Sequence, residues 1–179
     1  MKVVSGLKER QILTRLNKGL VVIAMLSCSV ATVGAQQDFT FATPDGQTIP
    51  ISSMRGKVVV LLFSGVQDPQ RREGLTALES LAKRYQGKDV KVCWVSVNSS
   101  TELTDAQLKS AGGAATSVTV LRDINQAAFK RFSGKLAQLP TVVILDRQGN
   151  AVGQPRGGFN PNSDFINDLA SAIDGLLKR

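Results

Sequence analysis

Few residues of this 179-residue chain are of the types that most often act as nucleophiles, general bases or metal ligands, and this limits the functions that the protein can have. The chain contains no histidine and two cysteines, Cys28 and Cys93. Without histidine it lacks His general bases, Ser-His triads and His-ligated metal sites. Two cysteines are too few for a disulfide framework or a thiolate metal cluster. We therefore expect no metal site and no cofactor.

Cys93 lies within an apolar run from Val90 to Val97, which predicts a buried strand. Side chains alternate along a strand, so Cys93, Val95 and Val97 should share one face while Trp94 lies on the other. A cysteine in a central strand is usually an inert core residue. A peroxidatic cysteine would need a loop or helix-start position, and Cys93 is not expected to occupy one.

The chain is organised around residues 56–79, GKVVVLLFSGVQDPQRREGLTALE. The run from Val58 to Phe63 is apolar and rich in β-branched residues, which predicts a strand buried on both faces. Residues 64–67 then form a short loop. Asp68 and Pro69 have the pattern of a helix start, with Asp68 as the N-cap and Pro69 at the first helical position.

Hydrophobic periodicity and turn residues predict the remaining elements. Strands are expected near residues 39–41, 48–52, 90–97, 118–122, 142–146 and 151–154, and helices from 68 to about 85, from 104 to about 111, over 125–132, and from Asn162 or Ser163 to the end.

The order of strand, tight loop and helix start, with Leu139-Pro140-Thr141 later in the chain, resembles the thioredoxin fold. Residues 38–57 resemble the N-terminal hairpin of the exported TlpA-type redoxins, within the AhpC/TSA-redoxin superfamily. The resemblance covers residues 38–177. It implies an α/β fold, a three-layer α/β/α sandwich with a central mixed sheet and an N-terminal β-hairpin. Residues 1–35 would then be a signal peptide and 36–179 the redoxin domain.

TlpA-type redoxins carry Trp-Cys-x-x-Cys-Arg where the loop meets the helix, and residues 67–72 match that motif. Asp68 stands at the first cysteine position and Arg71 at the second, so the resemblance implies a thioredoxin scaffold without its dithiol. A carboxylate cannot exchange with a disulfide, and we expect Asp68 to be a helix cap worth about 1 kcal/mol. The alternative is that it presents an anion to a basic partner. Arg71 would pair with Asp68 or point to solvent.

Residues 139–141 match the family's cis-proline loop, which in the family faces the cysteines and shapes a groove for an extended peptide. The resemblance therefore implies a partner-binding surface made of Gln67, Asp68, Leu139, Pro140 and Thr141. Its partner would be an envelope protein or peptide in the former substrate groove. A purely structural role for the loop is the alternative.

The first 35 residues have the layout of a secretory signal peptide, with a basic start, an apolar run from Leu20 to Val33, and small residues before Gln36. We expect cleavage after Ala35 and a periplasmic or secreted protein. The protein would be tethered to the membrane if the segment is retained, and lipidation at Cys28 is a less favoured alternative. The net charge is +8, but the basic residues are scattered, so no nucleic-acid binding is expected.

Three functions fit these features. We favour a redox-inactive peptide- or protein-binding module of the cell envelope, which would make the chain no enzyme. The second is a thiol-disulfide oxidoreductase of the TlpA type that acts through Cys93 or through residues that no motif identifies. The third is a structural subunit of an envelope assembly.

Overall fold

The computed structural model describes residues 38–113, 115–134, 138–157 and 163–179. The chain divides into two units, Met1–Gln36 and Gln37–Arg179. The expected signal peptide over residues 1–35, with Cys28, lies outside the described residues. Within the described part of the chain, no helix is both long enough and apolar enough to cross a membrane.

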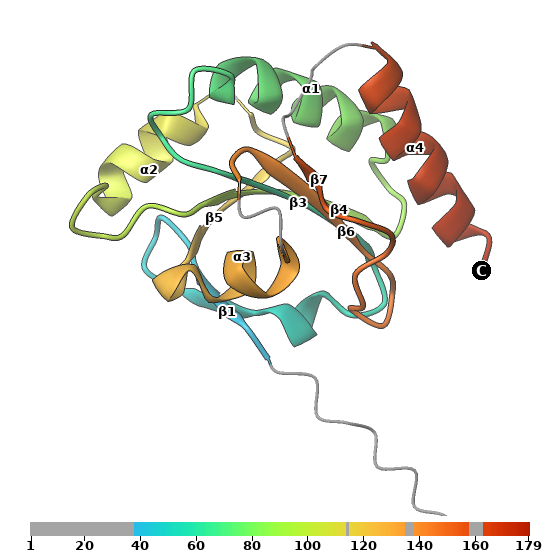
Figure 1. Cartoon of the computed structure of the whole chain (residues 1–179), viewed down its shortest axis with the longest axis horizontal. Helices are drawn as coiled ribbons and strands as arrows, with labels where there is room; N and C mark the ends of the chain where they lie inside the picture. The colour runs from blue at the N-terminus through green and yellow to red at the C-terminus, as the bar shows by residue number, and fades with distance from the viewer. Residues whose placement is uncertain (1–37, 114, 135–137, 158–162) are drawn as a thin grey trace, which may run out of the picture. The chain divides into compact units, whose positions relative to one another are not determined.

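Seven strands form one mixed sheet in the order β2-β1-β5-β4-β3-β6-β7 (Figure 1). Strands β3, β4 and β5 run parallel, while β6 is antiparallel to β3 and β1 is antiparallel to β5. The N-terminal β-hairpin that the resemblance implied is formed by β1 and β2, and it extends the sheet beside β5. The strands are β1 (Thr40–Ala42), β2 (Thr48–Pro50), β3 (Val58–Ser64), β4 (Val90–Ser96), β5 (Thr119–Asp123), β6 (Thr141–Leu145) and β7 (Arg156–Gly157).

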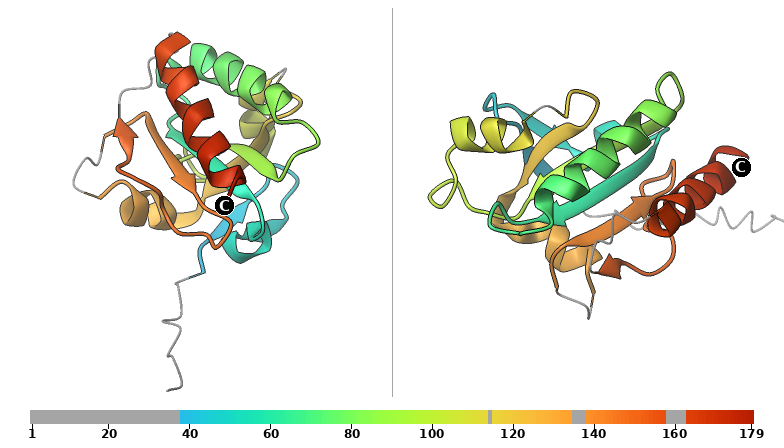
Figure 2. Two further views of the ribbon diagram at one scale, coloured as in Figure 1. Left: turned by 90° about the vertical axis from the view of Figure 1, so that its right-hand side faces the viewer. Right: turned by 90° about the horizontal axis from the view of Figure 1, so that it is seen from above.

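Helices cover both faces of this sheet, which gives the expected three-layer α/β/α sandwich (Figures 1 and 2). Three helices pack on one face: α1 (Arg71–Arg84), α2 (Asp105–Gly112) and α4 (Ser163–Leu177). The short helix α3 (Ala127–Phe132) and the 3-10 helix η1 (Ile51–Met54) pack on the other, and a second 3-10 turn, η2 (Ile124–Gln126), leads into α3.

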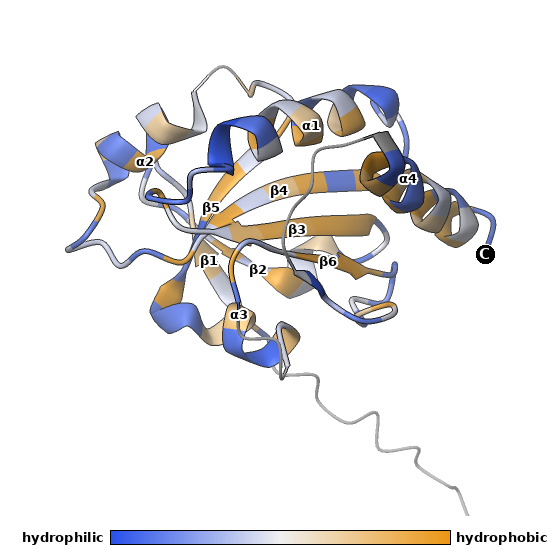
Figure 3. Ribbon diagram, turned by 45° about the horizontal axis from the view of Figure 1, so that its top comes forward, coloured by the Kyte–Doolittle hydropathy of each residue, from blue (hydrophilic) through white to orange (hydrophobic). Residues whose placement is uncertain are grey.

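The central strand β3 explains why helices cover both faces of the sheet. All seven of its residues are buried, and Figure 3 shows the inner strands as the apolar centre of the domain. Alternation sends Val58, Val60 and Leu62 into the core under α1 and α4, and sends the residues between them into the core under α3. Burial on both faces is what an unbroken apolar strand requires.

The predicted return strand over residues 151–154 is wrong. Ala151 forms a lone bridge with Leu145, and the paired strand begins at Arg156. Gly153 interrupts the pairing because it has φ of +71°, a conformation outside the strand region. The chain therefore turns away from the sheet edge before β7 rejoins it.

The predicted helix over residues 125–132 begins two residues later, at Ala127. Asn125 and Gln126 have φ of 57° and 56°, so they lie in the left-handed region and do not continue a helix. The buried Asp123 accepts hydrogen bonds from the amides of Ala128 and Phe129, at 3.0 and 2.6 Å. Helix α4 begins at Ser163, while Asn162 lies outside the described residues.

Candidate partner-binding site

Strand register places the predicted site residues at one end of the sheet. Phe63, next to the end of β3, lies opposite Thr141, the first residue of β6. Thr141 in turn lies opposite Gly157 of β7. The loop after β3 and the loop before β6 therefore leave the sheet at the same end. Gln67 and Asp68 lie in the first of these loops, and Leu139 and Pro140 lie in the second.

Asp68 is not the N-cap of α1, so that prediction is wrong. The helix begins at Arg71, and its N-cap, Gln70, makes no side-chain cap bond. Asp68 Oδ1 instead accepts a hydrogen bond from the Gln70 amide at 2.9 Å, and the Arg71 amide donates to the Asp68 carbonyl at 3.1 Å. Asp68 and Pro69 thus form an Asx turn that leads into the helix, a geometry that Asp favours as readily as capping.

Arg71 pairs neither with Asp68 nor with solvent alone. Its Nη1 donates to the carbonyl oxygen of Ala111 at 3.1 Å, and its guanidinium lies 5.9 Å from the centroid of the buried Trp94 ring. Ala111 is in the last turn of α2, where backbone carbonyls lack helical partners. Arg71 therefore fastens the start of α1 to the end of α2.

The loop before β6 presents one exposed apolar side chain. The Leu139–Pro140 peptide bond is cis. Leu139 is 40% exposed, while Pro140 and Thr141 are buried and the Thr141 hydroxyl donates to the Gln138 carbonyl. Gln67 is exposed and Asp68 is partly exposed. Of the five predicted residues, Gln67, Asp68 and Leu139 can therefore meet a partner directly.

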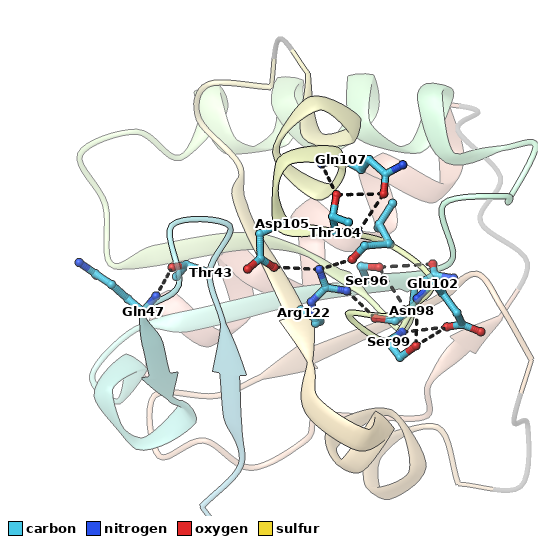
Figure 4. Close-up of polar contacts among 11 residues, drawn as sticks. Thr43, Gln47, Ser96, Asn98, Ser99, Glu102, Thr104, Asp105, Gln107 and Arg122 are labelled. Atoms are coloured by element: carbon cyan, nitrogen blue, oxygen red, sulfur yellow. Dashed lines mark hydrogen bonds and ion pairs between the residues drawn. The ribbon is translucent and has the colours of Figure 1, made fainter.

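A polar network next to this surface was not predicted from the sequence (Figure 4). Arg122 is 5% exposed and donates to the carbonyl oxygens of Asn98 and Leu103, at 2.8 and 2.6 Å, and to Asp105 Oδ1 at 3.0 Å. Asn98 Oδ1 in turn accepts a hydrogen bond from the Val66 amide at 2.8 Å. Arg122 and Asn98 thus tie the loop after β4 to the loop that carries Gln67 and Asp68.

Two carboxylates near this network have shifted pKa values of opposite sign. The Ser99 amide and hydroxyl both donate hydrogen bonds to Glu102 in the loop after β4, and these bonds lower the pKa of the Glu102 carboxyl. Burial raises the pKa of Asp123, despite the hydrogen bonds from the Phe129 and Ala128 amides that favour its charged form. Among the described residues, neither carboxylate makes a hydrogen bond or an ion pair with Cys93, so neither activates its thiol.

Cys93 is the cysteine that the described residues contain, and it is a free, fully buried thiol. It has no exposed surface and lies in the core under α3, on the face opposite Trp94, as predicted. Burial raises the pKa of its thiol to about 12. The thiolate is the nucleophilic form of cysteine, so this environment suppresses thiol chemistry at neutral pH.

The fold and the site together define a thioredoxin-like domain whose loop between β3 and α1 contains no cysteine. Residues 33–152 match the model of the AhpC/TSA family, and the chain belongs to this family. No curated protein matches the chain.

Solved structures share the fold across nearly their whole length. A crystal structure of the pneumococcal exposed lipoprotein thioredoxin from Streptococcus pneumoniae is 22% identical, with a TM-score of 0.62, covering 75% of this chain and 98% of its own. A proposed thiol:disulfide interchange protein DsbE from Chlorobium tepidum is 24% identical, with a TM-score of 0.63 and coverages of 78% and 93%. A proposed protein disulfide isomerase from Bacteroides thetaiotaomicron is 25% identical, with a TM-score of 0.63 and coverages of 79% and 87%.

Proposed function

We propose that this protein is an exported thioredoxin-like module of the TlpA type that has no redox activity and binds an extended polypeptide of the cell envelope. Gln67, Asp68 and Leu139 would contact the partner, while the buried Pro140 and Thr141 would hold Leu139 in place. The observation that carries the proposal is the absence of any cysteine from residues 65–70, the loop between β3 and α1, and from Arg71, the first residue of α1, in a domain that otherwise keeps the redoxin architecture. Export rests on the signal-like residues 1–35.

The burial of Cys93 argues against the oxidoreductase alternative. A thiol that attacks a disulfide must be ionised and accessible to its substrate. Cys93 has no exposed surface, and its pKa is raised to about 12. Opening a path to it would require displacing the layer of α3 and η1 that packs over its face of the sheet.

The exposed side chains at this end of the sheet support a binding role. Leu139 is one of three large apolar side chains in the described part of the chain that are exposed, the others being Ile124 and Val152. The loop that carries Gln67 and Asp68 leaves the sheet at the same end as Leu139, and a surface that combines apolar and polar side chains suits a polypeptide. The Asn98 and Arg122 hydrogen bonds hold the loop in place, so less ordering is required when a partner binds.

The experiment compares three proteins for retention of peptides from an immobilised random-sequence library. The proteins are the mature wild type, Leu139→Asp and Val152→Asp. Val152 is 36% exposed against 40% for Leu139, but it follows the hairpin turn after β6 and lies away from the sheet end, so it is a matched control. The proposal expects wild type and Val152→Asp to retain the same peptides and Leu139→Asp to lose most of them. Equal retention by all three proteins, or none by the wild type, would refute it.

A further inference from the structure

A cavity of about 510 Å³ opens between α1 and the end of α2, on the face of the sheet that both helices cover (Figure 2). Its volume is within the usual range for small-molecule sites, roughly 300–1,000 Å³. The lining residues belong to one face of α1, between Arg71 and Lys83, and to residues 110–113 and 115 at the end of α2. Gln67, Asp68 and Leu139 do not line it, so the cavity is separate from the candidate partner-binding surface.

Small residues make the α2 side of this cavity. Residues 110–113 and 115 are Ser, Ala, Gly, Gly and Ala, so they place no long side chain opposite α1. Gly112 is buried against the sheet, where an added Cβ would meet Val120 Cγ2 at 2.5 Å. The backbone at the end of α2 therefore lies close to the sheet, and space remains beside α1.

The α1 side of the cavity carries an unbalanced positive charge. Its lining includes three basic residues, Arg71, Arg72 and Lys83, and one acidic residue, Glu79. The Lys83 Nζ lies 3.4 Å from Glu79 Oε1, and Glu79 Oε2 accepts a hydrogen bond from the Ser117 amide at 2.9 Å. Among the described residues, no carboxylate forms an ion pair with either arginine. The two arginines can therefore pair with an anion that enters the cavity.

Arg71 is already held in place beside the cavity. Its Nη1 donates to the Ala111 carbonyl oxygen at 3.1 Å, and its guanidinium lies 5.9 Å from the centroid of the Trp94 ring. A guanidinium has five N–H donors in a planar fork that suits a carboxylate, and the bond to Ala111 uses one of them. Because the side chain is already ordered, it loses little further freedom when an anion binds. The start of α1 at Arg71 adds positive potential at the same place.

Apolar surface lines the cavity beside the two arginines. Leu75 lies one turn after Arg71 on α1, and Ala111 and Ala115 line the opposite side. Glu79 is two turns beyond Arg71, roughly 12 Å along the helix axis at 1.5 Å per residue. An anionic group at the arginines would therefore be followed by apolar walls before the next charged side chain.

We propose that this cavity binds a small molecule that carries a carboxylate on an apolar body, as a fatty acid does. The carboxylate pairs with Arg71 and Arg72, and the body lies against Leu75, Ala111 and Ala115. Inorganic phosphate would use the arginines but leave the apolar walls in contact with water. An alcohol with the same apolar body would use the walls but supply no charge to the arginines. The inference does not depend on the proposed binding of a polypeptide.

Titration of the isotope-labelled mature protein with octanoate, octanol, acetate and inorganic phosphate tests this proposal. Shifts of the backbone amide resonances locate the binding site and give each dissociation constant. Octanoate should shift the amides of residues 71–83, 110–113 and 115 more than those of the rest of the domain. It should bind at least about tenfold more tightly than each of the other three compounds, because only octanoate has both the charge and the apolar body.

Matched variants separate the contribution of charge from that of shape. Arg71→Gln should weaken octanoate binding by about tenfold and Arg72→Gln, at an exposed position, by about threefold, whereas Arg131→Gln, on α3 at the other face of the sheet, should leave it unchanged. Ser110→Leu should weaken binding because the larger side chain occupies the cavity, and Ser110→Ala should not. Urea denaturation confirms that each variant is folded; Arg72 and Ser110 are exposed, so their substitution leaves the core intact.

Equal affinities for octanoate and octanol, or unchanged octanoate binding in both Arg71→Gln and Arg72→Gln, would overturn the inference, since the arginines would then not hold the ligand. Tighter binding of phosphate than of octanoate would overturn it as well. So would resonance shifts confined to residues outside the cavity, or octanoate binding that Ser110→Leu does not weaken. These outcomes leave the proposed peptide binding untouched, because that surface is tested by Leu139→Asp.

Discussion

Replacing Arg122 by Ala should destabilise the domain by about 2–4 kcal/mol, because two backbone carbonyl oxygens lose a charged hydrogen-bond donor. The Asn98 and Leu103 carbonyls would each lose a hydrogen bond from a charged donor, worth about 1.5–3 kcal/mol, and the losses do not add fully. The ion pair with Asp105 contributes little, about 0–1 kcal/mol, because the Asp105 side chain is 50% exposed. The two backbone contacts therefore dominate.

Urea denaturation of four proteins at neutral pH measures this effect. Asp105→Asn should reduce the free energy of unfolding by less than about 1 kcal/mol. Arg131→Ala, at an exposed position on α3, should change it by no more than about 0.5 kcal/mol. Hydrogen exchange at the Val66 amide should accelerate in Arg122→Ala, since Asn98 is the acceptor of that amide. An Arg122→Ala loss below about 1 kcal/mol, or one equal to that of Asp105→Asn, would refute the reasoning.

Three further results are expected. Cys93 should stay unmodified by a thiol reagent in the native protein at pH 8 and react fully in denaturant, because it is buried and its pKa is raised to about 12; fast native labelling would contradict this. Gly112→Ala should destabilise by about 1–3 kcal/mol in denaturant melts, because a Cβ there would meet Val120 Cγ2 at 2.5 Å, whereas Gly175→Ala in the open part of α4 should be neutral or stabilising. Stability should also fall between about pH 10 and pH 12: burial raises the pKa of Tyr85 from 10.0 to about 12, so the folded state keeps a proton that the unfolded state has lost. Tyr85→Phe should flatten that slope in melts across pH, and an unchanged slope would assign it to other groups.

The sheet could be predicted because each inner strand is recognisable from its own stretch of sequence. The runs from Val58 to Phe63 and from Val90 to Val97 are apolar on both faces, which few other structures allow. The edge of the sheet could not be predicted as well. Turn residues locate the turn after β6, but where β7 rejoins the sheet depends on the φ of Gly153 and on pairing with Thr141 and Val142.

The site was harder to predict because its residues contact partners that are distant in the sequence. Asp-Pro fits both an N-cap and an Asx turn, and sequence alone does not distinguish the two. Arg122 contacts residues 17 to 24 positions away, so its partners became visible only with the fold. The available signal was a charged residue at the end of a predicted strand, which the fold buries. Such a residue usually has a specific partner.

The central claim is that this redoxin-family domain has lost thiol-disulfide chemistry while keeping the fold. Its most direct test is the reduction of insulin by dithiothreitol, followed by turbidity, with the mature protein, its Cys93→Ser variant and a dithiol thioredoxin as the positive control. We expect the mature protein and Cys93→Ser to give the same rate as dithiothreitol alone. A rate above that background in the mature protein, abolished by Cys93→Ser, would contradict the account.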